Sequence, residues 1–316
     1  MSALGLGGVL LWLVCGGADV AGGLAHDVLS VHGSTRGTAY VMSNKVVSLG
    51  EGRARRTHVI WLEYQQGEEG KQSAVKARSF DHGAGQWGEP AHVGDGHDNH
   101  AGGALAADSK GVLHCVYGPH HGPFQYRHTL RPNDVREWSP VTLFGKSCTY
   151  PSMVVDAEDT LHVACRDEKA PFKLNYYWKP RGGTWQGPVM LVDPTVPGGY
   201  TQYGNALAID RRGRIHMAYH IYDLHPAAGK YAGYMRSDDR GKTWCKADGT
   251  ALELPVTRET GDTVMRGDDI DIRCCNVVTD AQDNPWFCIV HVKNRRLSLH
   301  HHDGQAWRTL DLMPYI

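Results

Sequence analysis

Short apolar runs alternate with tight polar turns along most of this chain. Around one such turn, residues 104–107 and 112–117 are apolar and rich in β-forming residues, while Asp108 and Gly111 occupy the first and fourth turn positions. Asp and Gly tolerate the positive φ that a tight reversal requires. This pattern predicts a β-hairpin. Amphipathic helical periodicity is nearly absent, which argues against an α/β fold.

The same hairpin sequence recurs at a spacing of about 50 residues, which is the range of repeat architectures. The best copy begins at Asp108, and the others begin at Asp156, Asp210 and Asp280, with a degraded copy at Gly52. A self-similar period of this length indicates that one supersecondary unit is used repeatedly.

A glycine-containing turn that ends in tryptophan follows each hairpin. These tryptophans are Trp87, Trp138, Trp185, Trp244 and Trp307. The sharpest copy, Ser237 to Trp244, matches the Asp-box pattern S-x-D-x-G-x-T-W. In such a turn we expect the Asp239 carboxylate and the hydroxyls to bind the reversing backbone, with the indole packed between neighbouring sheets.

Two hairpins per module give four strands, and radial repetition of such sheets is a β-propeller. The sequence therefore predicts an all-β fold, a β-propeller of four-stranded antiparallel blades. Five modules are legible, from about Ala39 to Leu312.

The N-terminus contains an apolar run, residues 9–14, followed by small residues up to Ala25. This pattern is typical of a secretory signal peptide, although no Lys or Arg precedes the run. We therefore expect residues 1–25 to be a signal peptide and residues 26–316 to form a single propeller domain, secreted or periplasmic. The run is too short to span a bilayer, so an untargeted apolar N-terminus is the alternative.

The composition excludes some partners. Lys and Arg total 33 against 34 for Asp and Glu, so no global field favours nucleic acid or an anionic membrane. The length suits one toroidal domain, which we expect to be a monomer. Eight cysteines include Cys15 in the expected signal peptide. Cys115, Cys165 and Cys288 lie in predicted strands and are expected to be buried apolar residues rather than a disulfide set.

The symmetry of a hairpin predicts which side chains meet. Residues equidistant from the turn are cross-strand neighbours, and residues two apart share a face. Counting from each turn pairs His100 with His120, Tyr150 with Arg166, Gly204 with His220 and Gln202 with Tyr222. All these positions lie at the end opposite the turn, so we expect them to converge on one rim of the propeller.

Imidazoles, a phenol and a guanidinium around a concave mouth suit acid-base work on an anionic substrate. Simpler interpretations remain for each residue. Most of the 19 histidines are expected to be solvated or packing residues. Arg166 could pair with Asp167 or Glu168, and Tyr150 could cap a strand before Pro151.

The stretch from His97 to Arg166 resembles the BNR-repeat β-propeller polysaccharide lyases, above all the ulvan lyases. The resemblance rests on His100 and His120, twenty residues apart, and on Tyr150 and Arg166, sixteen apart in a Thr-Tyr-Pro-Ser context. It implies a seven-bladed propeller, whereas this chain shows five modules.

The resemblance also implies roles in β-elimination from an anionic, uronic-acid-containing polysaccharide such as ulvan. Arg166 would neutralise the uronate carboxylate, and His100 would be the base. Tyr150 would be the acid or a second base, and His120 would bind or orient the substrate. Further candidate substrate contacts are Asn99, His121, Tyr203, His220 and Tyr222.

Such chemistry requires no cofactor. A structural zinc or calcium ion would be compatible with the fold, and the candidate ligands are Cys274, Cys275 and His291. No tight CxxC or HxxxH spacing supports them, so buried apolar cysteines are the alternative.

Two other functions remain open. Asp-box propellers include sialidase-like glycoside hydrolases, which need an arginine cluster with a Tyr/Glu pair or two opposed carboxylates. Asp268, Asp269 and Asp271 are the unplaced carboxylates that keep hydrolysis open. A non-catalytic carbohydrate-binding propeller with an incidental His-rich rim is the third possibility.

Overall fold

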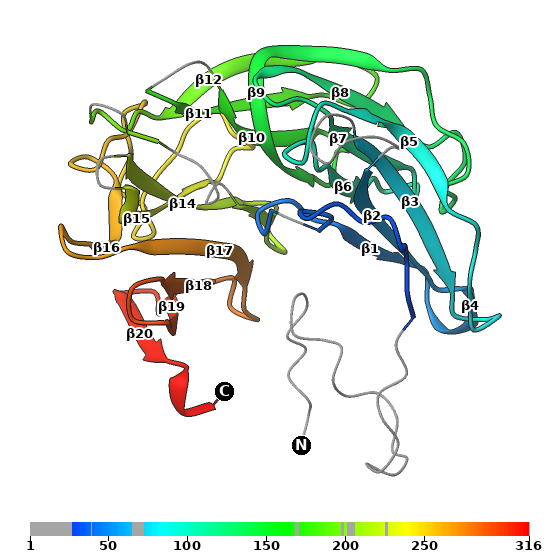
Figure 1. The fold of residues 1–316 in the computed structure, drawn as a ribbon. Helices are drawn as coiled ribbons and strands as arrows, with labels where there is room; N and C mark the ends of the chain where they lie inside the picture. The colour runs from blue at the N-terminus through cyan, green and yellow to red at the C-terminus, as the bar shows by residue number, and fades with distance from the viewer. Residues whose placement is uncertain are drawn as a thin grey trace.

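The computed structural model describes residues 27–38, 40–64, 73–167, 171–196, 199–200, 206–224 and 227–315. The expected signal peptide, residues 1–25, lies outside this part. Within it the chain is almost entirely β-structure (Figure 1), with two short 3-10 helices, η1 (Gly52–Ala54) and η2 (Met313–Tyr315). No helix in these residues has the length and apolar character needed to cross a bilayer.

The strands form five successive antiparallel modules. The first contains β1 (Val46–Leu49), β2 (Arg56–Tyr64) and β3 (Ser73–Asp81), with β4 (Gln86–Trp87) and β5 (Ala91–Gly96) both paired to β3. The second contains β6 (Ala104–Ala107), β7 (Leu113–Tyr117), β8 (Gly122–His128) and the start of β9 (Thr142–Val155). The third contains the end of β9, β10 (Leu161–Asp167), β11 (Lys173–Lys179) and β12 (Gln186–Val192). The fourth contains β13 (Ala206–Ile209), β14 (Ile215–Leu224), β15 (Ala227–Ser237) and β16 (Asp262–Arg266). The fifth contains β17 (Ile272–Thr279), β18 (Pro285–His291), β19 (Arg296–His302) and β20 (Trp307–Asp311).

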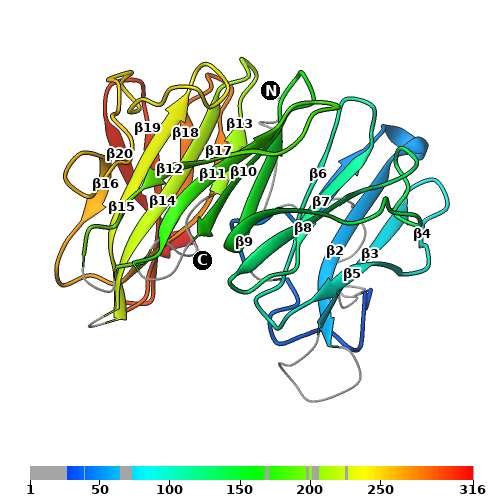
Figure 2. The ribbon, with the colours of Figure 1, turned by 90° about the horizontal axis from the view of Figure 1, so that it is seen from above.

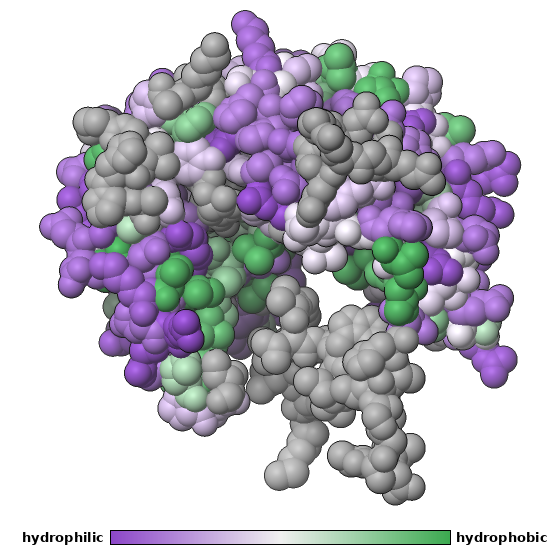
Figure 3. Space-filling model, viewed as in Figure 1, coloured by the Kyte–Doolittle hydropathy of each residue, from purple (hydrophilic) through white to green (hydrophobic). Residues whose placement is uncertain are grey.

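The modules follow one another along an arc from β1 round to β20 (Figure 1), and Figure 2 shows them side by side when seen from above. The first strand of each module contacts that of the next, in the order β1, β6, β9, β13 and β17. This confirms the predicted all-β propeller of four-stranded blades, with five blades in the described residues. The face seen in Figure 3 is mainly hydrophilic, with apolar residues in small patches.

The aspartate that begins each repeat fixes the hairpin turn with its own side chain. Asp156 Oδ1 accepts hydrogen bonds from the backbone N–H groups of Glu158 and Thr160, at 2.9 and 2.8 Å. The same two bonds, from the second and fourth residues after the aspartate, form at Asp108, Asp210 and Asp280. The carboxylate therefore serves as the hydrogen-bond acceptor for backbone N–H groups of the turn.

A histidine links three of these turns to the sheet, while Asp280 accepts the Trp286 indole N–H at 3.0 Å instead. The His162 ring lies with Nε2 3.2 Å from Asp156 Oδ2 and Nδ1 2.6 Å from the Tyr176 hydroxyl on β11. We call this arrangement the Asp-His-Tyr relay. It recurs as Asp210-His216-Tyr234 and, with a longer separation of 3.5 Å between its carboxylate and imidazole, as Asp108-His114-Tyr126. The relay ties the turn to the second and third strands of the blade.

The Asp-box turn has the predicted geometry. Asp239 Oδ1 accepts the backbone N–H of Thr243 at 2.8 Å, and its Oδ2 accepts the Thr243 hydroxyl at 2.7 Å. Trp244 is 2% exposed and meets the Tyr176 ring of the third blade edge-on, at 5.7 Å between centroids. The indole therefore packs between two blades, as the sequence indicated.

The described cysteines are all free thiols. Cys115 and Cys165 are fully buried, as expected, and Cys288 is half-buried.

We predict that the protein loses stability in mild acid. Burial lowers the pKa of His114 to about 4, and burial also lowers the pKa of His162. Between about pH 6.5 and 4 these histidines are protonated in the unfolded chain but neutral in the folded chain. The free energy of unfolding therefore falls as the pH drops through this range. His114 alone should contribute about 2 kcal/mol to this loss by about pH 5.

Urea unfolding at about pH 7 and about pH 5 measures the effect. The pH dependence should weaken in His114→Gln. Equal unfolding free energies at both pH values would contradict the prediction.

Candidate active site

Four of the side chains that the sequence placed on one rim lie together. The rings of His100 and His120 stack with centroids 4.0 Å apart. The Tyr150 ring lies 6.0 Å from that of His100, and the Arg166 guanidinium lies 4.6 Å above the Tyr150 ring. We call these four residues and His121 the rim cluster.

His121 closes the rim cluster into a ring. Its imidazole stacks on His120 at 4.5 Å, and its Nε2 lies 3.2 Å from Arg166 Nη2. Its backbone N–H donates to the Thr149 hydroxyl at 3.0 Å, and Arg166 Nη2 donates to the same oxygen at 2.9 Å. Thr149, which the sequence did not single out, therefore fixes both the guanidinium and the histidine loop.

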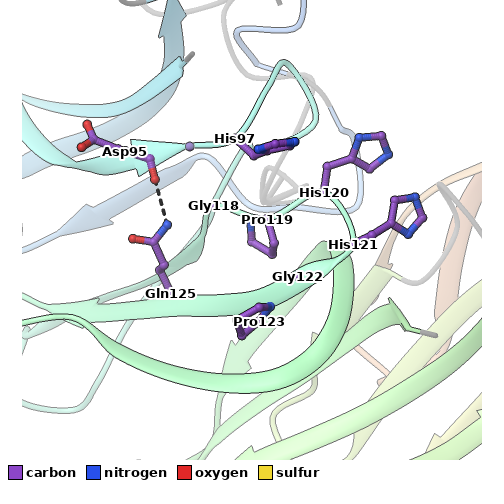
Figure 4. A pocket seen from close by; sticks show the side chains of 10 residues that line it. Asp95, His97, Gly118, Pro119, His120, His121, Gly122, Pro123 and Gln125 are labelled. Atoms are coloured by element: carbon purple, nitrogen blue, oxygen red, sulfur yellow. Dashed lines mark hydrogen bonds between the residues drawn. The ribbon is translucent and has the colours of Figure 1, made fainter. Parts of the chain in front are cut away.

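A pocket of about 430 Å³ lies beside the rim cluster. Figure 4 shows the rings of His120 and His121 projecting side by side from the segment that joins β7 to β8, with His97 across from them. Gln125 on β8 donates to the Asp95 carbonyl at 2.8 Å and forms part of the wall. The pocket therefore borders the segment that carries two of the rim histidines.

Asp98 connects the two stacked histidines. Its Oδ2 lies 2.7 Å from His120 Nδ1, and its Oδ1 lies 3.1 Å from His100 Nδ1 and accepts the His100 backbone N–H at 2.7 Å. Because a carboxylate only accepts, these contacts assign the Nδ1–H tautomer to both rings and leave each Nε2 with its lone pair. Burial opposes ionisation of Asp98, but the hydrogen bonds from His100 and His120 outweigh it and lower its pKa.

The sequence analysis did not single out Asp98. A carboxylate two residues before a candidate base was the available signal.

His100 is a neutral imidazole at neutral pH. Burial, the neighbouring His120 and the Arg36 guanidinium lower its pKa to about 4, against the opposing effect of Asp98. Arg36 Nη1 hydrogen-bonds to His100 Nε2 and to the Tyr40 hydroxyl. Arg36 and Tyr40 precede β1, where no repeat pattern marked them.

Arg166 is held inside an aromatic enclosure. It is 1% exposed, and its guanidinium lies 4.6 Å from the ring centroid of Phe172 and 5.0 Å from that of Tyr200, in addition to Tyr150. Its Nη1 donates to the Tyr200 hydroxyl, while its buried Nε has no hydrogen-bond partner among the described residues. A desolvated guanidinium of this kind attracts a carboxylate much more strongly than one in water.

The expected pairing of Tyr150 with Arg166 is wrong by one residue. Ser152 lies opposite Ala164, as the register predicted, but Arg166 lies opposite Thr149 because a bulge intervenes. Tyr150 sits in this bulge with φ of 60°, and Pro151 cannot donate to the ladder. The bulge still turns the Tyr150 ring onto the Arg166 guanidinium.

His100 and His120 are neighbours without being a strand pair. β6 begins only at Ala104 and β7 ends at Tyr117, so both histidines lie on the connecting segments beyond the ladder. Stacking and the shared Asp98 carboxylate, rather than backbone pairing, bring them together.

The remaining candidate contacts occupy different surroundings. Asn99 is half-buried and donates to the Thr35 hydroxyl at 3.4 Å. Tyr222 donates its backbone N–H to the Tyr200 carbonyl at 2.8 Å, and its ring lies 4.5 Å below the Arg273 guanidinium.

His220, expected on the rim, is 1% exposed and lies between β14 and β17, where its Nδ1 accepts the Cys274 backbone N–H at 3.2 Å. Its position in the core corrects the expectation of a surface contact. Tyr203, Gly204 and Gln202 lie outside the described residues.

The carboxylates that kept hydrolysis open are not part of the rim cluster. Asp271 pairs with Arg273 and accepts the Gly229 backbone N–H at 2.8 Å, while Asp269 pairs with Lys293 at 2.9 Å. The rim cluster itself contains imidazoles, a phenol and a guanidinium around Asp98.

The metal ligands expected from the sequence do not come together. Cys274 Sγ lies 3.4 Å from the Tyr219 carbonyl, and His291 Nε2 lies 2.8 Å from the Ser298 hydroxyl. Cys275 follows Cys274 on β17, so their side chains leave opposite faces of the strand. Among the described residues, three potential ligand atoms approach within 4.8 Å in two other groups, Asp98-His100-His120 and Cys148-Cys165-Asp167.

A family model described as BNR repeat-containing family member matches residues 38–313. A search of curated proteins found no match. The fold is similar to that of a family PL25 ulvan lyase solved with a ligand of glucuronic acid and sulfated rhamnose, at 17% identity and a TM-score of 0.73, covering 90% of this chain and 74% of that one. It is also similar to the polysaccharide lyase Uly1 at 12% identity and a TM-score of 0.62, covering 91% and 76%.

A GH93 α-L-arabinofuranosidase of Fusarium graminearum matches at 13% identity and a TM-score of 0.51, covering 88% of this chain and 83% of that one. At these identities the similarity concerns the fold.

We predict that Asp98 sets the tautomers of His100 and His120. Histidine ring 15N NMR of the wild type should show Nδ1–H forms for both rings, assigned with His100→Gln and His120→Gln. In Asp98→Asn the amide oxygen can still accept, but the ionised carboxylate that held both rings is lost, so at least one ring should move towards the Nε2–H form. Asp134→Asn, which changes a carboxylate beside exposed Arg136, is the control. Nε2–H forms in the wild type would contradict the assignment.

Proposed function

This chain belongs to the BNR repeat-containing family, and we propose that it is a polysaccharide lyase that cleaves a uronic-acid-containing polysaccharide by β-elimination. The observation that carries the proposal is the rim cluster, which combines a buried guanidinium, neutral imidazoles and a phenol in one ring of contacts. The fold of this chain is shared with structures described as polysaccharide lyases.

Elimination from a uronate begins with removal of the C5 proton, which is α to the carboxylate. This proton is weakly acidic unless the developing enediolate is neutralised, and a guanidinium bound to the carboxylate supplies that stabilisation. Arg166 is the neutraliser in this proposal. The Tyr200 hydroxyl now occupies its Nη1, so the substrate carboxylate would take the place of that hydroxyl.

The elimination also needs a base to take the C5 proton and an acid to protonate the leaving oxygen. His100 takes the C5 proton on the Nε2 lone pair that now accepts from Arg36. The electron pair left on C5 forms the C4–C5 double bond as the C4–O bond breaks, and Tyr150 protonates the departing oxygen. His120 would orient His100 through stacking and the shared Asp98. His121 and Asn99 are the proposed contacts for flanking sugars.

An ulvan-like polymer is the proposed substrate class. The PL25 relative was solved with glucuronic acid and sulfated rhamnose. Arg166 in the rim cluster and Arg36 beside His100 supply two guanidiniums for an anionic chain. Such polymers lie outside the cell, which agrees with the expected export of this protein. Asp-box hydrolysis and sugar binding without cleavage are the outcomes that the following experiment separates from elimination.

The test is incubation with a panel of uronate-containing glycans, ulvan among them, followed by ultraviolet absorbance of the conjugated product and mass analysis. A lyase leaves a double bond in the product. Cleavage with addition of water and no absorbance would indicate a hydrolase, and glycan retention without cleavage would indicate a lectin. Either result would overturn the proposal.

Arg166→Ala and His100→Ala should each reduce formation of the unsaturated product by at least about 10²-fold, because each removes a group that acts on the transition state. Arg131→Ala and His82→Ala are matched controls, since both residues are exposed and lie outside the rim cluster. Near-ultraviolet circular dichroism checks the fold of each variant. Wild-type activity in either rim variant would refute the assigned roles.

Tyr150→Phe tests the acid separately. The variant keeps the ring that packs against Arg166 and removes only the hydroxyl, so the fold should persist while turnover falls by about 10²-fold or more. Substrate binding, measured by retention on immobilised glycan, should change little. Unchanged turnover would remove Tyr150 from the reaction.

A further inference from the structure

A second cluster of reactive side chains lies behind the rim cluster, on the other face of β10. Cys165 and Asp167 alternate with Arg166 along this strand, so their side chains leave the face opposite the guanidinium. Cys148 on β9 and Tyr177 on β11 complete the cluster. All four residues are buried, with exposures between 0 and 4%.

The contacts among these groups are short. Cys148 Sγ lies 3.6 Å from Asp167 Oδ2 and 3.9 Å from the Tyr177 hydroxyl, and that hydroxyl donates to Asp167 Oδ2. One sulfur each from Cys148 and Cys165 and one oxygen from Asp167 lie within 4.8 Å of one another.

We propose that Cys148, Cys165 and Asp167 bind a zinc ion in the interior of the propeller, behind Arg166. Two thiolates and a carboxylate are ligands that zinc takes in tetrahedral sites. With Zn–S near 2.3 Å and Zn–O near 2.0 Å, a tetrahedral site separates sulfur and oxygen by about 3.5 Å, which agrees with the observed 3.6 Å. The Tyr177 hydroxyl, which donates to Asp167 Oδ2, would orient the carboxylate ligand.

Gly145 packs directly against the Cys148 sulfur. Gly145 has φ of 72°, and a Cβ at this position would lie 2.3 Å from Cys148 Sγ. The glycine therefore keeps clear the space that the sulfur occupies.

The charges of the three ligands suit a divalent cation. Zinc binding releases the two thiol protons, and the ion offsets the negative charges of both thiolates and the carboxylate.

The ion would have a structural role and would take no part in catalysis. Cys148 precedes Thr149, which binds Arg166, and the Tyr150 bulge follows directly. Zinc held by β9 and β10 would fix the strand positions from which Thr149 and Arg166 project. The site needs no substrate, so its test is independent of the proposed lyase activity.

The experiment measures zinc in the untagged full-length protein after growth and purification with zinc and thorough dialysis. Wild type should carry about one zinc per chain, while Cys148→Ser and Cys165→Ser should each lose most of it. Cys275→Ser is the matched control, because this half-buried cysteine belongs to the ligand set that the structure does not bring together, and it should retain the ion.

Cobalt exchange gives a readout that needs no variant. Cobalt-substituted wild type and Cys275→Ser should both show sulfur-to-cobalt charge-transfer absorption, even if a ligand variant fails to fold. Intact mass spectrometry shows whether two of the thiols have formed a disulfide. Wild type without zinc or this absorption, zinc that persists in a folded Cys165→Ser, or a mass lower by two hydrogens that shows a disulfide would each overturn the proposal.

Discussion

The Asp-His-Tyr relay is the constraint on which the rest of the structure depends. In the third blade, Asp156 closes a turn through two backbone N–H groups and at the same time binds His162, which reaches Tyr176 on the next strand. Buried polar groups are costly unless paired, so this set of contacts is satisfied in only one register. Fixing the turn end of each hairpin also fixes which residues emerge at the opposite end, where the rim cluster lies.

The rim cluster departs from this regularity at the residues whose chemistry matters most. Tyr150 adopts a left-handed φ in a bulge, and His121 has φ of 64°. Residues held in sparsely populated conformations persist only where surrounding contacts hold them, and such sites are often functional. Here Thr149 provides the contact, since its hydroxyl binds both the His121 backbone and the Arg166 guanidinium.

Electrostatics distinguish the rim cluster from the relays, although both pair histidines with an aspartate. In the relays of the third and fourth blades a carboxylate and a phenol occupy both ring nitrogens, so the imidazole is structural. In the rim cluster Asp98 binds the Nδ1 side of two rings, and the Nε2 side of His100 meets the guanidinium of Arg36. Only this second arrangement leaves a basic nitrogen that a substrate can reach by displacing one group, which is what proton abstraction requires.

The sequence by itself determined the architecture, because a repeated Asp turn, a following histidine and a Trp turn are local signals with a fixed period. Hairpin symmetry also placed His100, His120 and Arg166 at one end of their blades. Tertiary structure alone decided that Arg166 pairs with Thr149, that His220 lies in the core and that Arg36 joins the rim cluster. The physical reason is that register counting assumes an uninterrupted ladder. A bulge, packing between blades and a segment outside the repeats are all set by contacts between residues distant in sequence.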